Sequence, residues 1–116
     1  NEHVAYLYEP LHPAVLRLLK MVCDAARANK IGVSICGEMA AEPIYGLILM
    51  GLGFTELSMN PHCVLRVKRV LRQISCSDGE AFLSEIMGMA TALEVVCRLE
   101  EEMGNRFPEL FGTMSI

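Results

Sequence analysis

The chain has 116 residues, a formal net charge of −4 and 53% hydrophobic residues. This length permits one compact domain, since single hydrophobic cores are commonest at about 100–150 residues. The acidic balance excludes a general nucleic-acid surface, which needs an excess of basic residues. Charged residues interrupt every apolar run before it reaches the roughly 20 residues of a membrane span, so we expect no membrane protein.

The mean hydropathy of +0.36 is high for a soluble protein. Few charged side chains remain to cover the apolar ones, so we expect apolar surface that contacts a partner and, in particular, a homo-oligomer. The first four residues contain neither Met nor a basic segment. We therefore expect the sequence to begin inside a longer protein or after processing.

The cysteines indicate a reducing compartment. Their number is odd and no two have a short paired spacing such as CxxC, so we predict reduced thiols and a cytoplasmic protein. The five are Cys23, Cys36, Cys63, Cys76 and Cys97.

Helical and extended patterns alternate over the first part of the chain. Apolar spacing predicts a helix from Pro13 to about Asn29, followed by a strand over 31–35 that is buried on both faces. A short helix should begin at Pro43, and a second strand, 54–59, should precede a helix that begins at Pro61. Such alternation predicts parallel strands joined by helical crossovers, as in doubly wound folds and the (β/α)8 barrel.

The last part of the chain has a helical pattern. Ser77 and Glu80 have capping-box spacing ahead of an apolar stripe, which predicts one long helix over about 79–103. Residues 107–111 should form a turn that folds back or docks on a neighbour. Because two strands alone cannot form a stable parallel sheet, we expect the chain to be a section of a larger fold.

Cys36 and Gly37 follow the first predicted strand, which in a barrel is the position of the catalytic rim. A buried cysteine that acts as a small hydrophobe is the commoner role, and position alone does not decide between the two. Gly37 lets a ligand approach the backbone closely, and the carboxylate of Glu38 should keep the neighbouring thiol protonated. A protonated thiol acts as an acid rather than as a nucleophile.

Three segments resemble, in order and spacing, the end of the phosphoenolpyruvate-binding barrel of enzyme I, the phosphotransferase of the bacterial sugar phosphotransferase system. They are residues 6–20 (YLYEPLHPAVLRLLK), 35–40 (ICGEMA) and 51–59 (GLGFTELSM). The resemblance runs from residue 1 to about residue 75. Pyruvate phosphate dikinase and phosphoenolpyruvate synthase share a related Cys-Gly motif, but the first and third segments favour enzyme I.

The resemblance implies that phosphoenolpyruvate gives its phosphoryl group to a histidine of the enzyme, which passes it to a phosphocarrier protein for sugar uptake. It also implies that Mg²⁺ holds the resulting enolate and that Cys36 is the proton donor to carbon 3. A thiol is acidic enough to protonate a far more basic enolate, which becomes pyruvate. Gly37 matches a glycine whose backbone lies beside the substrate. The family's metal ligands, phosphate ligands and phosphohistidine fall upstream of Asn1, so we expect no metal ligand and no bound Mg²⁺ here.

The predicted fold class is therefore α/β. Residues 1–75 should form the C-terminal part of a (β/α)8 barrel with about two parallel strands, and residues 76–116 a helical extension with a long helix. The whole protein would be a cytoplasmic, dimeric phosphotransferase, and this chain alone would be inactive. The alternatives are a dikinase-type enzyme and a non-catalytic dimerisation module with a structural Cys36. A thiol redox protein ranks last, since its cysteine needs a basic neighbour or a second cysteine nearby.

Overall fold

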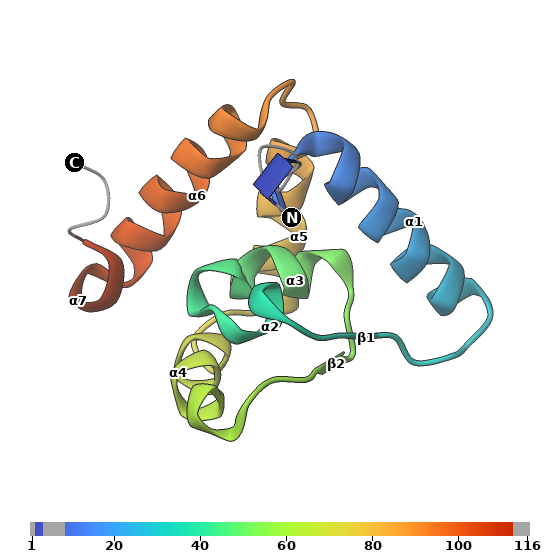
Figure 1. The fold of residues 1–116 in the computed structure, drawn as a ribbon, viewed down its shortest axis with the longest axis horizontal. Coiled ribbons are helices and arrows are strands. Elements are labelled where there is room, and N and C mark those ends of the chain that lie inside the picture. Colours follow the sequence, from blue (N-terminus) through green and yellow to red (C-terminus); the bar gives the residue numbers. More distant parts are fainter. Residues whose placement is uncertain (1, 4–8, 113–116) are drawn as a thin grey trace.

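The computed structural model describes residues 2–3 and 9–112 and is mostly helical, with one small parallel sheet (Figure 1). Residues 4–8, which include the start of the first resembling segment, lie outside the described residues. The elements in chain order are α1 (Pro13–Ala28), β1 (Ser34–Ile35), α2 (Glu38–Ala41), the 3-10 helix η2 (Pro43–Tyr45), α3 (Gly46–Leu52), β2 (Glu56–Leu57), α4 (Pro61–Leu71), α5 (Cys76–Ile86), α6 (Ala92–Arg106) and α7 (Pro108–Phe111).

Helix α1 has the predicted bounds. It begins where His12 Nδ1 accepts a hydrogen bond from the Ala14 N–H at 3.0 Å, with Pro13 in the first turn, where no backbone donor is needed. It ends at Ala28, and the N–H of the C-cap residue Asn29 donates to the Ala25 carbonyl. The predicted helix from Pro13 to about Asn29 is confirmed.

The two strands are parallel, as predicted, but shorter. Ser34 pairs with Glu56 and Ile35 with Leu57. The prediction that the first strand is buried on both faces is wrong: Ser34 is exposed and Ile35 is half-buried against the core. The reason is that helices pack on one face of the sheet only, so the side chains alternate between exposed and half-buried.

Helix α3 lies at the centre of the molecule, between α1 and α6, which Figure 1 shows on opposite sides. All its residues except Met50 are buried. The hydrophobic core built around it is continuous from Leu11 to Phe111, so the C-terminal helices share one core with the sheet region. The helix ends at Gly53, whose φ of 100° is a left-handed conformation that favours glycine.

Two helices replace the single long helix predicted over 79–103. The capping box is formed by Ser75 and Asp78 rather than by Ser77 and Glu80, through the Asp78 N–H to Ser75 Oγ and the Ser75 N–H to Asp78 Oδ2, both at 3.0 Å. Helix α5 ends at Ile86, and Thr91 then caps α6. The chain turns over residues 87–91, between the two helices, so the prediction of one continuous helix is wrong.

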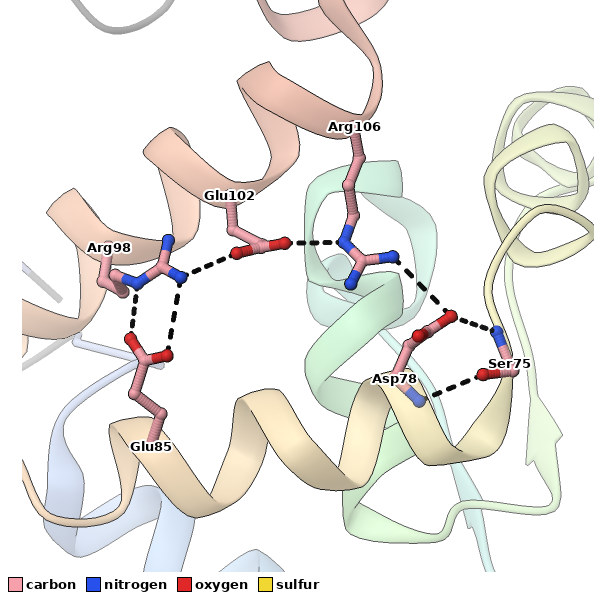
Figure 2. A network of polar contacts seen from close by, with 6 residues as sticks. All are labelled: Ser75, Asp78, Glu85, Arg98, Glu102 and Arg106. Atoms are coloured by element: carbon pink, nitrogen blue, oxygen red, sulfur yellow. Dashed lines mark hydrogen bonds and ion pairs between the residues drawn. The ribbon is translucent and has the colours of Figure 1, made fainter.

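A chain of ion pairs joins α6 to α5 (Figure 2). Arg98 pairs with Glu85 on α5 and, at 2.7 Å, with Glu102 on its own helix. Glu102 also accepts from Arg106 at 2.7 Å, and Arg106 reaches Asp78 at the start of α5 at 3.6 Å. Both ends of α5 are thereby tied to α6.

The C-terminal segment folds back on α6, as the sequence predicts. It forms the short helix α7 rather than a simple turn. Phe107 and Phe111 are buried with their rings edge to face, 6.2 Å between centroids and 89° between planes. This geometry is a favoured aromatic arrangement, so the two rings fix the fold-back.

Among the described residues, no helix combines the length and apolar character needed to cross a membrane.

Candidate functional site

Cys36 directly follows β1 and is exposed at the carboxyl end of that strand. This is the position that the sequence predicts for a catalytic thiol. The alternative role, that of a buried small hydrophobe, describes Cys23 instead. Burial, with a smaller contribution from Asp24, raises the pKa of the Cys23 thiol. The exposure of Cys36 therefore argues against a packing role for it.

Gly37 adopts a backbone conformation that side-chain-bearing residues rarely adopt, with φ 83° and ψ −160°. A Cβ at this position would meet no atom within 4 Å, so the backbone angle rather than lack of space requires glycine. Helix α2 begins immediately afterwards at Glu38. The space beside the Gly37 Cα is therefore open.

Cys36 lies between two cavities of different character. The first, of about 360 Å³, lies between α1 and β1 and is mostly apolar, with Val15, Leu19 and Met39 in its wall. The second, of about 440 Å³, lies toward β2 and is more polar, with Gly37, Ser58 and Asn60 in its wall. Glu38 lines both cavities, and Glu9 lines the first. A small molecule in either cavity would meet the thiol.

The ends of the two strands meet at the second cavity. The Ser58 N–H donates to the Ile35 carbonyl at 2.9 Å, which holds the carboxyl end of β2 beside that of β1. Asn60 follows as the N-cap residue of α4, but its side chain makes no capping hydrogen bond. Ser58 and Asn60 were not among the site residues predicted from the sequence. The rule that selected Cys36, a polar residue just after a parallel strand, would also have selected them.

The described residues contain no group of three or more His, Cys, Asp or Glu side chains placed to hold a metal ion. A Mg²⁺ site needs several oxygen ligands in near-octahedral geometry. The described part of the chain therefore does not fit the Mg²⁺ that the resemblance implies.

A family model matches the part of the chain that contains these residues. Residues 1–76, which include both strands and both cavities, match the family model described as "PEP-utilising enzyme, PEP-binding domain". The chain belongs to this family of PEP-utilising enzymes. This match confirms the resemblance to PEP-utilising enzymes, and Cys36 and Gly37 fall inside the matched residues.

Individual relatives of this PEP-binding domain are named phosphoenolpyruvate-protein phosphotransferase. The chain is 44% identical over 96 residues to that of Priestia megaterium, 41% over 101 residues to that of Bacillus subtilis (strain 168), and 36% over 101 residues to that of Haemophilus influenzae. These matches cover 83%, 87% and 87% of the chain but only 17%, 18% and 18% of the relatives. The chain thus spans less than a fifth of the length of these proteins.

Proposed function

We propose that the chain is part of a phosphoenolpyruvate–protein phosphotransferase, enzyme I of a sugar phosphotransferase system, in which Cys36 is the proton donor. The observation that carries this proposal is the exposed thiol at the carboxyl end of β1, in the wall of two cavities within the matched PEP-binding region. The names of the relatives supply the reaction. The phosphoryl group would move to a histidine of the enzyme and then to a phosphocarrier protein.

The step assigned to Cys36 is a single proton transfer. When phosphoenolpyruvate loses its phosphoryl group, the enolate of pyruvate remains. The Sγ–H bond of Cys36 breaks, the proton forms a new C–H bond at carbon 3, and the enolate becomes pyruvate. The thiolate left behind regains a proton from water, which the exposure of Cys36 permits.

Gly37 is proposed to place its backbone against the substrate. Its left-handed φ and the open space around its Cα support this role, since a side chain there would occupy the substrate's approach. A residue with a Cβ would also strain the turn that brings Cys36 to the end of β1.

The parallel pair β1–β2 is proposed to be part of a (β/α)8 barrel. Its exposed face supports this assignment, because Ser34 and Glu56 lie on a face of the sheet that no described helix covers. A cytoplasmic location is supported by the five free thiols.

We propose no step through Mg²⁺. Calorimetric titration of this chain with Mg²⁺ should show no saturable binding, and stoichiometric binding would contradict our placement of the metal ligands.

A second candidate function is that of a non-catalytic dimerisation module. The observation that favours it is a set of exposed apolar side chains on one helix, α1: Leu18, Met21 and Val22. The two functions are compatible in one protein, since an enzyme can also dimerise. They differ in whether Cys36 has a chemical role.

A chimera tests the first proposal. This chain would replace the matching segment of the Priestia megaterium relative, to which it is 44% identical. We expect the chimera to consume phosphoenolpyruvate in the presence of that organism's phosphocarrier protein. A chimera that unfolds at the same temperature as the parent enzyme but does not use phosphoenolpyruvate would contradict the proposal.

A further inference from the structure

Ser58 lies directly across the sheet from Cys36. The register pairs Ser34 with Glu56 and Ile35 with Leu57, so its next step pairs Cys36 with Ser58. The hydrogen bond from the Ser58 N–H to the Ile35 carbonyl, at 2.9 Å, continues the parallel ladder to this pair. Neighbouring strands are about 4.8 Å apart, so the two residues are close neighbours.

The side chains of Cys36 and Ser58 also share one face of the sheet. Successive side chains of a strand point to opposite faces, and paired residues of neighbouring strands point to the same face. Ile35 and Leu57 are half-buried against the core, whereas Cys36 and Ser58 are both exposed. Both line the cavity of about 440 Å³. The thiol and the hydroxyl therefore face the same space.

The charges around the thiol make a neutral donor important. The titratable groups that line the two cavities beside Cys36 are the carboxylates Glu9 and Glu38, and Glu56 lies on the same face of the sheet. Within the described residues, no Lys, Arg or His lines either cavity. A thiolate formed here has no cation from these walls to stabilise it. Hydroxyl and amide groups are the side-chain donors that remain, and Ser58 is the one in register with Cys36.

We propose that Ser58 is a positioning residue for the proton transfer by Cys36. Its Oγ–H donates a hydrogen bond to the thiolate that remains on Cys36 after the proton has gone to carbon 3. Ser58 keeps its own proton throughout, and water returns a proton to Cys36. The role in turnover rests on the proposed function, but the contact between hydroxyl and thiolate does not.

The contact has a measurable effect in this chain alone, because a thiolate rather than a thiol reacts with iodoacetamide. Hydrogen bonds to an ionised acceptor are stronger than those between neutral groups. Loss of the hydroxyl should therefore slow the alkylation of Cys36 by about fivefold at one fixed neutral pH. The comparison uses Ser58→Thr and Ser58→Val, which have nearly the same shape and differ in the hydroxyl. Alkylation at each cysteine is followed by mass spectrometry of its peptide.

The same sample contains its own controls. Cys76 and Cys97 are exposed on other helices, so their alkylation rates should not change. Cys23 is buried and should stay unmodified as long as the variant is folded. We expect Ser58→Thr to react like the wild type and Ser58→Val to react more slowly at Cys36 alone. Equal rates for Ser58→Thr and Ser58→Val in folded protein would overturn the inference.

The chimera described above separates this inference from the proposed function. With pyruvate in D₂O, Ser58→Val should lower kcat for deuterium uptake into the methyl group by about fivefold and leave KM for pyruvate unchanged. Ser58→Thr, which keeps the hydroxyl, should have the kcat of the wild type. If Val slows alkylation but Cys36→Ala exchanges deuterium at the wild-type rate, the hydroxyl–thiolate contact stands and the proposed function fails. If Cys36→Ala abolishes exchange but Thr and Val are identical in both measurements, the proposed function stands and this inference fails.

Discussion

Gly51 and Gly79 are in direct backbone contact where α3 crosses α5. A Cβ on Gly51 would lie 2.2 Å from the Gly79 carbonyl oxygen, and a Cβ on Gly79 would lie 2.6 Å from the Gly51 nitrogen. Real Cβ atoms essentially never approach other atoms this closely, so the crossing requires glycine on both helices. With glycine at both positions, α5 packs on the buried helix α3 more closely than it could if either residue carried a side chain.

We predict that Gly79→Ala lowers the free energy of unfolding by about 1–3 kcal/mol, the usual cost of overpacking. Alanine favours helix over glycine by about 0.5–1 kcal/mol, so the clash must exceed this gain. Urea unfolding measures the change. Gly104→Ala, inside α6, is the matched control, because its Cβ would lie an ordinary 3.5 Å from the Phe111 carbonyl oxygen. If Gly79→Ala were as stable as Gly104→Ala, the tight crossing would be contradicted.

The ion pairs between α5 and α6 predict a dependence of stability on pH. Burial alone would raise the pKa of Glu102, but hydrogen bonds from Arg106 and Arg98 outweigh it and lower the pKa. A carboxylate with a lowered pKa stabilises the fold above its unfolded pKa of about 4.3, and this contribution is lost as the pH falls through the folded pKa.

Glu102→Gln should therefore lower the Tm at neutral pH, by an amount equivalent to about 1 kcal/mol, and the difference from wild type should shrink below about pH 4. Thermal melting between neutral and acidic pH checks this. Glu101→Gln, an exposed neighbour outside the ion-pair chain of Figure 2, should change the Tm little at any pH. A constant difference between wild type and Glu102→Gln across the pH range would contradict the role of the charge.

Self-association is predicted from the exposed apolar residues of α1. Light scattering of the chain at about ten or more micromolar, where species with exposed apolar surface associate, should give a mass above that of the monomer. Met21→Glu should reduce this mass because it places a charge in the apolar patch. Leu93→Glu, at an exposed position on α6, is the control. A monodisperse monomer in the wild type would remove the basis of the dimerisation module.

The sequence predicts the helix starts where one local signal acts alone. Pro13 and Pro61 each stand at the first helical position, and α1 and α4 begin there. The start of α5 could not be chosen in this way, because Ser75–Asp78 and Ser77–Glu80 have the same capping-box spacing. In the structure Ser75 and Asp78 form the box, and Asp78 also pairs with Arg106 of α6, a contact between distant residues that no local pattern contains.

The sequence predicts the site residue at the end of β1 but not the residue beside it at the end of β2. Cys36 could be placed because it follows an apolar, β-branched segment directly. The placement of Ser58 opposite Cys36 follows from the register between two strands, and that register joins residues far apart in the sequence. The prediction that the first strand is buried on both faces was wrong for a related reason. The pattern of a strand alone does not reveal which neighbours cover each face of the sheet.

Deuterium uptake by pyruvate tests the central claim, that Cys36 is the acid, most directly. An acid that protonates carbon 3 of the enolate must, in reverse, remove a proton from the methyl group of bound pyruvate. In D₂O, the chimera that contains this chain should therefore introduce deuterium into the methyl group. Cys36→Ala should abolish the uptake without changing the unfolding temperature, while Cys76→Ala and Cys97→Ala should leave it unchanged. If Cys36→Ala takes up deuterium at the wild-type rate, Cys36 is not the acid.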